Sequence, residues 1–164
     1  MTVRSRQKKI RNLVSSINPL STIEGRMTGA YTISPSGNRY HMSLPSRPKV
    51  VDNVFEYGCS CYNVSDPSGM PACRGNSYDT VCYHCIATLI ARAERLGYEI
   101  IIPNRYESAV KIADKIDGCV IKLKSNQGDG VVWLVGKKVL KTDEPIVSAS
   151  TGIDMMRGPD KEID

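Results

Sequence analysis

The sequence feature that most constrains the fold is a dense cluster of cysteine and histidine between residues 59 and 85. The stretch CSCYNVSDPSGMPACRGNSYDTVCYHC holds five of the six cysteines and one of the two histidines in 27 of the 164 residues. Such a density predicts a disulfide cluster, a redox site or a metal site. The N-terminal segment MTVRSRQKKIRNL lacks the apolar core of a signal peptide, and no apolar run is long enough to cross a membrane. We therefore expect a reducing, intracellular compartment, where metal binding is favoured over structural disulfides.

Zinc takes four thiolate or imidazole ligands in a tetrahedron, and the spacing of this cluster can supply them. Two thiolates one residue apart, as in Cys59-Ser60-Cys61, can bind one ion if the chain turns tightly between them. A second pair, Cys82-Tyr83-His84, follows after 20 residues at the start of an expected helix. A site with four protein ligands is structural and not catalytic, because no coordination position remains for water.

Other assignments of the cluster stay open on the sequence alone. Cys85 could replace His84 as a ligand, although it lies on the helix face that we expect to pack inward, where a thiol acts as a small hydrophobe. Cys73, in an expected loop, could also be a ligand. Six cysteines permit 15 disulfide connectivities, but the expected compartment disfavours them. A catalytic dyad of Cys82 and His84 would need an orienting group and an oxyanion hole, and neither is recognisable.

The pattern resembles that of the SWIM zinc-finger family, whose signature is C-x-C, a spacer of variable length and C-x-H. The resemblance covers about residues 39–92, including aromatic strand positions before the first pair and an apolar helix after the histidine. It implies a binding module, since SWIM domains are associated with binding to DNA or to other proteins. It also implies one structural zinc ion, with four ligands: Cys59, Cys61, Cys82 and His84.

The hydrophobic periodicity predicts an α+β fold, in which a small zinc-stapled β-hairpin and helix module is followed by a strand–helix–strand–strand unit. In the first module we expect two strands within residues 30–45, a third strand over 49–57 that leads into Cys59, and a helix over 82–96. In the second unit we expect a strand over 98–102, a helix within 104–117, and strands over 119–124 and 131–135. Gly97 and Gly118 are expected to end the two helices.

Four segments are expected along the chain: a basic flexible arm (1–28), a SWIM-like zinc module (29–97), a small α+β unit (98–141) and an acidic flexible tail (142–164). The total net charge of +5 is unevenly spread, because residues 1–23 carry five basic side chains and no acidic one. The arm could form a short basic helix whose small apolar face docks on the body. We expect disorder instead, since termini without strong docking fray.

Nucleic-acid binding is the function that we expect from these features, with a protein-interaction adaptor of a larger complex as the alternative. Flexible basic segments contact phosphates, and lysines on an exposed strand face add charge. We expect no enzyme, because no P-loop, dinucleotide-binding fingerprint or H-E-x-x-H motif is present. Arg92 and Arg95 on the expected helix are taken as further surface charge. The candidate nucleic-acid-binding residues are Arg4, Arg6, Lys8, Lys9, Arg11, Arg74, Lys122 and Lys124.

Overall fold

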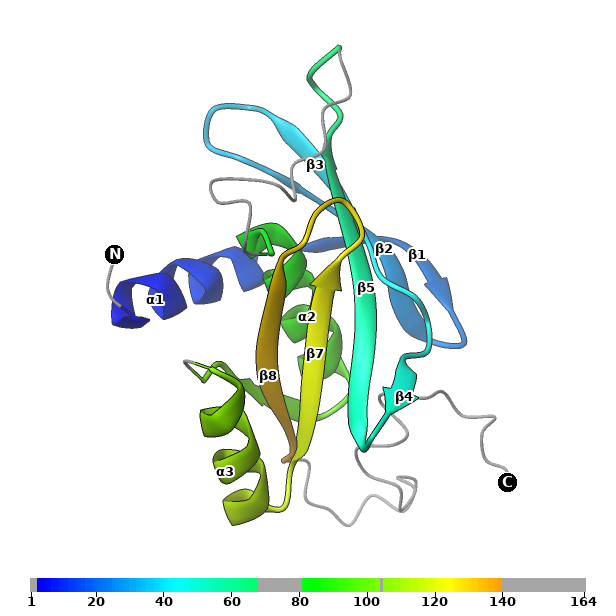
Figure 1. Ribbon diagram of the computed structural model, residues 1–164. Helices are drawn as coiled ribbons and strands as arrows, with labels where there is room; N and C mark the ends of the chain where they lie inside the picture. The colour runs from blue at the N-terminus through cyan, green and yellow to red at the C-terminus, as the bar shows by residue number, and fades with distance from the viewer. Residues whose placement is uncertain (1–2, 68–80, 104, 140–164) are drawn as a thin grey trace.

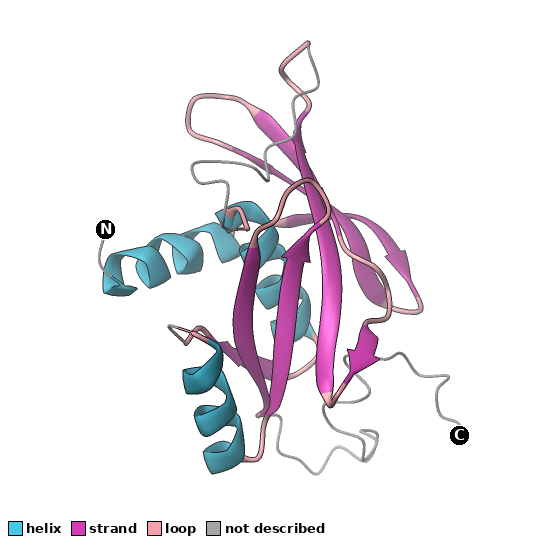
Figure 2. Ribbon diagram, viewed as in Figure 1, coloured by secondary structure: helices cyan, strands magenta, loops and turns pink. Residues whose placement is uncertain are grey.

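The computed structural model describes residues 3–67, 81–103 and 105–139, which form three helices and an eight-stranded curled sheet (Figures 1 and 2). The α+β fold class expected from the sequence is therefore confirmed. In chain order the elements are α1 (Val3–Val14), β1 (Asn18–Ile23), β2 (Arg26–Ile33), β3 (Arg39–Ser43), β4 (Lys49–Val51), β5 (Val54–Asn63), α2 (Tyr83–Arg95), β6 (Tyr98–Ile101), α3 (Tyr106–Ile116), β7 (Cys119–Ser125) and β8 (Val131–Lys138).

One sheet runs through both of the units expected from the sequence. The strand order is β1-β2-β3-β5-β7-β8-β6, and β4 pairs with β5 beside this path. The long strand β5 is central: it is antiparallel to β3 on one side and parallel to β7 on the other. The expected boundary after residue 97 follows α2, yet hydrogen bonding continues across it because β7 and β8 complete the sheet begun by the earlier strands.

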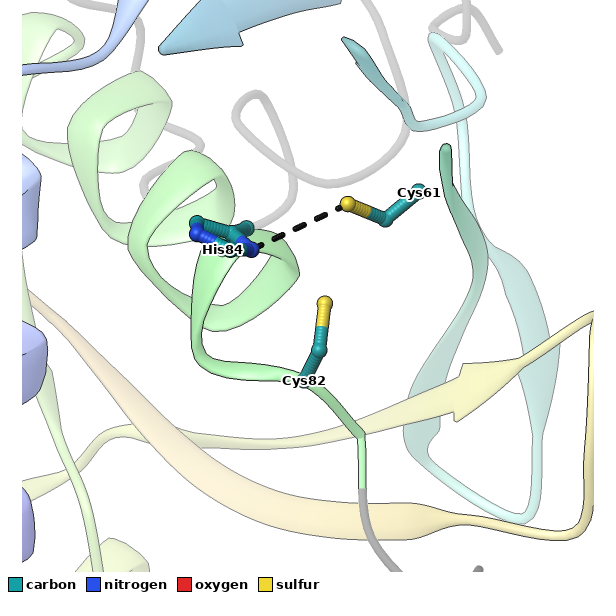
Figure 3. A group of neighbouring side chains, drawn as sticks. All are labelled: Cys61, Cys82 and His84. Carbon is teal, nitrogen blue, oxygen red and sulfur yellow. Dashed lines mark hydrogen bonds between the residues drawn. The ribbon is translucent and has the colours of Figure 1, made fainter. Parts of the chain in front are cut away.

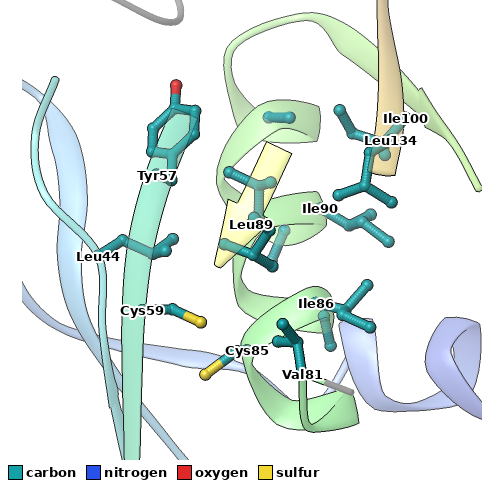
Figure 4. Packing of buried hydrophobic residues seen from close by; sticks show 14 of the residues in the cluster. Leu44, Tyr57, Cys59, Val81, Cys85, Ile86, Leu89, Ile90, Ile100 and Leu134 are labelled. Carbon is teal, nitrogen blue, oxygen red and sulfur yellow. The ribbon is translucent and has the colours of Figure 1, made fainter. Parts of the chain in front are cut away.

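The helices lie on both faces of this sheet. We call the face covered by α2 the inner face; α1 packs on α2, and α3 packs on the opposite, outer face of β7 and β8 (Figure 2). The main core lies between α2 and the inner face, where alternate residues of β5 and the apolar side of α2 meet (Figure 4). Alternation along a strand places successive side chains on opposite faces, so β5 presents one residue in two to this core.

Most of the expected elements are present, but the segment expected as one strand over 49–57 is two strands. Asp52 and Asn53 adopt positive φ angles of 48° and 67° and form the turn of a β4–β5 hairpin. Asn and Asp tolerate this left-handed conformation better than most residues, which explains why the chain reverses there. As a result β5 continues through Cys59 to Asn63, and the Cys59-Ser60-Cys61 segment is extended rather than a tight turn.

The expectation of a flexible arm over residues 1–28 is wrong for residues 3–28, which form α1, β1 and the start of β2. Ile10 is fully buried because the small apolar face of α1 packs against α2, and Ile17, just after the helix, is also buried in the main core. Gln7 Nε2 also donates a 2.8 Å hydrogen bond to the carbonyl of Ile102. Docking of the apolar face thus overrides the tendency of a short terminal helix to fray. The acidic tail expected over residues 142–164 lies outside the described residues.

Arg92 was expected to add surface charge, and this expectation is wrong. Its side chain is only 2% exposed, and its guanidinium group donates to three backbone carbonyls from two other segments. The acceptors are Met27 O at 3.0 Å, Pro45 O at 2.8 Å and Ser46 O at 3.1 Å. A buried cation needs such partners, so Arg92 ties α2 to β2 and to the loop after β3. Arg95, one turn later, is exposed as expected.

Candidate metal centre and basic surfaces

Two elements bring the cysteine and histidine side chains together. Along β5, Tyr57, Cys59 and Cys61 alternate with more exposed residues and all face the inner side of the sheet. Cys82 is the N-cap of α2, in an extended conformation, and His84 lies in the first helical turn. The start of α2 is therefore held against the second half of β5, as the C-x-C and C-x-H spacing predicted.

Three side chains form a group that can hold a metal ion: Cys61, Cys82 and His84. Their ligand atoms all lie within 4.8 Å of one another (Figure 3). The Cys61 Sγ to His84 Nδ1 distance is 3.9 Å. Tetrahedral coordination with the usual Zn–S and Zn–N bond lengths would place such a pair of ligand atoms roughly 3.6 Å apart. Two thiols and one imidazole are thus close to coordination distance, with Nδ1 as the ring nitrogen that faces the group.

Cys59 and Cys85 lie beside this group without belonging to it. Both are fully buried on the inner side of the sheet (Figure 4). The Cys85 thiol donates to the carbonyl of Ser60 at 3.5 Å. Hydrogen bonds from Cys82, then Cys85 and to a smaller extent His84, hold the pKa of the Cys61 thiol well below its ordinary value. The described geometry therefore brings together three of the four ligands implied by the SWIM resemblance, whereas the fourth, Cys59, is buried on the same face of β5 but lies outside the group.

Neighbouring side chains fix the orientation of the group. The Tyr40 ring stacks on the His84 imidazole, with ring centroids 4.3 Å apart and an interplanar angle of 21°. In the turn between β7 and β8, Gln127 Oε1 accepts a 2.8 Å hydrogen bond from the backbone N–H of Cys61. Asn126 N–H donates to Cys59 O at 2.9 Å. The sequence predicts residues 125–130 as a turn, but it does not indicate that this turn holds the backbone of Cys59 and Cys61 by hydrogen bonds.

The remaining cysteine and histidine residues lie elsewhere. Cys119, expected in the core, packs against it, and burial raises the pKa of its thiol to about 11. His41, expected to be exposed, is half-buried on the outer face and accepts a 2.9 Å hydrogen bond from Arg39 Nε. Cys73, the other alternative ligand beside Cys85, lies outside the described residues, as does Arg74.

The expected nucleic-acid-binding residues fall on two separate surfaces. The first surface is α1, which packs on the inner side. Lys8 is exposed there and Arg6 is half-buried. Lys9 lies over the Tyr83 ring, and Arg11 forms an ion pair with Glu94. The side chain of Arg4 lies outside the described residues. On the outer face of β7, Lys122 lies 5.6 Å from the centroid of the Trp133 ring, and Lys124 Nζ is 3.9 Å from Glu56. The fold therefore does not bring the basic residues of α1 together with those of β7.

Comparison of the chain with protein-family models, with curated proteins and with solved structures finds no match. Among the described residues, no helix is both long and apolar enough to span a membrane. The function is therefore argued from the metal-capable group and from the charged and aromatic side chains of the sheet.

Proposed function

We propose that this chain is a zinc-stabilised, non-catalytic nucleic-acid-binding protein of a reducing, intracellular compartment. The zinc ion has a structural role, in which it links β5 to the first turn of α2. The outer face of the sheet supplies the contacts to DNA or RNA. Each part of this proposal is supported by a different set of side chains.

The identity of the metal follows from the donor set. Thiolates and imidazole are the ligands that zinc prefers in structural sites. Cys61, Cys82 and His84 supply three of them, and the fourth is Cys59, as the SWIM resemblance implies, or the adjacent Cys85. The side-chain amide of Gln127 accepts a hydrogen bond from Cys61 N–H through its oxygen. Its nitrogen, Nε2, is buried and has no hydrogen-bond partner among the described residues. A thiolate-rich metal centre beside it would provide an acceptor, as outer hydrogen bonds commonly do around metal ligands.

The observation that carries the nucleic-acid proposal is the charge balance of the sheet. The described strands contain seven lysine and arginine residues and only two glutamates. On the outer face, Arg39, Lys122 and Lys124 share the central strands with one acidic side chain, Glu56. A surface with an excess of positive charge attracts phosphates and makes binding dependent on salt. The seven basic residues are Arg26, Arg39, Lys49, Lys122, Lys124, Lys137 and Lys138.

Fluorescence anisotropy with labelled DNA across a salt series tests this proposal. We would compare the zinc-loaded protein with the double variant Lys122→Gln/Lys124→Gln. The matched control is Lys111→Gln/Lys115→Gln, which removes two exposed lysines from α3. Each lost phosphate contact reduces the slope of log affinity against log salt by about 0.9 on duplex DNA and about 0.7 on a single strand. We expect that reduction for the β7 variant alone. Absence of binding by the unmodified protein at low salt would refute the proposal.

A protein-interaction adaptor is the second candidate, and the edge strand β1 favours it. All six residues of β1 are exposed, and they include Leu20 at 47% and Ile23 at 52% exposure. An exposed edge strand with apolar side chains can pair with a strand of a partner. Co-purification of one stoichiometric protein that is lost in the variant Leu20→Lys, together with no salt-dependent nucleic-acid binding, would favour this function over the first.

A further inference from the structure

We propose that the outer face of β2, β3 and β5 is a stacking surface for single-stranded nucleic acid, with bases packed on Tyr62 and on the Arg39–Tyr31 pair. This inference rests on the proposed nucleic-acid-binding function and names the class of ligand. It adds to that function a set of residues that neither the cysteine pattern nor the lysines of β7 indicate.

Strand register places three rings in one line across three neighbouring strands. Tyr31 of β2 is paired with His41 of β3, and His41 is paired with Tyr62 of β5. All three side chains point away from the core, because their sequence neighbours Ala30, Met42 and Cys61 are buried on the inner face. Tyr62 is 43% exposed. The centroids of the Tyr31 and His41 rings are 6.4 Å apart, so the line is a spaced series of rings rather than one closed stack.

Arg39 converts one end of this line into a cationic platform. The centre of its guanidinium group lies 4.0 Å from the centroid of the Tyr31 ring. Its Nε donates to His41 Nε2, which fixes the group in place, and its two terminal nitrogens make no hydrogen bond within the described part of the chain. A guanidinium plane held in this way can stack on a base and donate to a phosphate at the same time.

The surroundings of this surface favour a nucleic acid as the occupant. Among the described elements, α3 is the helix on the outer face, and it packs over β7 and β8 rather than over β2 and β3 (Figure 1). The strands β1, β2 and β3 contain no acidic residue, and β5 contains only Glu56. Aromatic rings beside a fixed cation, on strands that carry a single acidic residue, match a chain of flat bases joined by phosphates.

Geometry also favours single strands over duplexes. The line of rings lies on strands in the interior of the sheet, between β1 on one side and β7 on the other. The major groove of DNA admits a helix or a two-stranded ribbon, so the broad face of this sheet cannot enter it. Rings stack on bases that are already unstacked, as they are in single-stranded segments.

The test measures anisotropy of labelled oligothymidylate and oligouridylate of about 12 nucleotides, and of a duplex of equal length, with the full zinc-loaded chain. The first variant is Tyr62→Ala, and its control is Tyr106→Ala, which removes a tyrosine of equal 43% exposure from α3. The second variant is Arg39→Lys, which keeps the charge but removes the guanidinium plane. Its control is Arg47→Lys, at an exposed arginine paired with Glu24.

We expect Tyr62→Ala and Arg39→Lys each to weaken single-strand binding roughly tenfold or more, which is the usual effect of losing one stacking contact. The salt dependence should not change, because neither substitution alters the charge, and duplex binding and both controls should match the unmodified protein. Equal losses in the controls, unchanged single-strand affinity in the two variants, or preferential duplex binding would overturn this inference while leaving the proposed function intact. Absence of binding to every probe at low salt would overturn both.

Discussion

Arg92→Met is the substitution whose effect the structure defines most clearly. Methionine is also a long and flexible side chain, so it can occupy much of the space of the arginine stem without overpacking. It removes the guanidinium group, and with it the three hydrogen bonds from α2 to the carbonyls of Met27, Pro45 and Ser46. Because these carbonyls belong to segments far away in the sequence, the substitution removes long-range hydrogen bonds that tie α2 to β2 and to the loop after β3.

Two opposing effects set the magnitude. A buried acceptor that loses its partner costs about 1–3 kcal/mol. The bond to Met27 O is buried, whereas the other two are partly buried and their carbonyls can recruit water. In the other direction, burial lowers the pKa of Arg92, and its Nε has no partner among the described residues, so removal of the guanidinium recovers some desolvation free energy. We expect a net loss of about 3 kcal/mol, out of a total stability of roughly 5–15 kcal/mol.

Urea unfolding of the zinc-loaded protein at fixed free zinc measures this loss. With an m-value of about 2 kcal/mol/M, the midpoint should fall by about 1.5 M. The control is Arg95→Met, one turn along the same helix. Arg95 is exposed, and its one side-chain hydrogen bond within the described part of the chain is a 3.8 Å contact to the Met27 sulfur. A midpoint for Arg92→Met within about 0.3 M of that control would correspond to less than about 1 kcal/mol and would refute the role assigned to the three hydrogen bonds.

Two further predictions concern the metal centre and the N-terminal helix. We compare Cys59→Ser with Cys85→Ser in the cobalt-substituted protein. Only one of them should weaken the sulfur-to-metal charge-transfer band, since a tetrahedral site has room for one more thiolate beside the three grouped ligands. Equal loss of the band in both variants, or in neither, would contradict a four-ligand site completed by one of these thiols. Ile10→Ala should lower the stability by about 3 kcal/mol in urea unfolding, because a buried large-to-small substitution leaves a cavity. The exposed control Asn12→Ala should have little effect, and an equally small effect for Ile10→Ala would restore the flexible-arm interpretation.

Local sequence patterns were sufficient for most of the secondary structure. The apolar spacing in residues 82–96 predicted α2, and the alternation around Cys119 and Val131 predicted the β7–β8 hairpin. These predictions succeed because the residues on one face of a helix are three to four positions apart in the sequence, and those on one face of a strand are two positions apart. The same locality explains the error over 49–57, where the left-handed turn at Asp52 and Asn53 interrupts an apolar run that reads as one strand.

The candidate site was predictable only in part. The spacing of Cys61, Cys82 and His84 indicated a metal site, and their ligand atoms are indeed close together. The sequence left open whether Cys85 replaces His84 as a ligand, because that choice depends on how the start of α2 is placed against β5. The stacking of Tyr40 on His84 and the hydrogen bond from Cys61 to Gln127 likewise depend on contacts between elements that no local pattern specifies.

By itself, then, the sequence determined most of the helices and strands after residue 28, their apolar faces, and that cysteine and histidine gather at one strand and one helix start. Only the tertiary structure decided that α1 is docked, that Arg92 is buried, and that Tyr31, His41 and Tyr62 lie in one line. The physical reason is that strand register and helix docking are set by contacts between residues far apart in the chain. A shift of one residue in register would move every side chain of a strand to the other face.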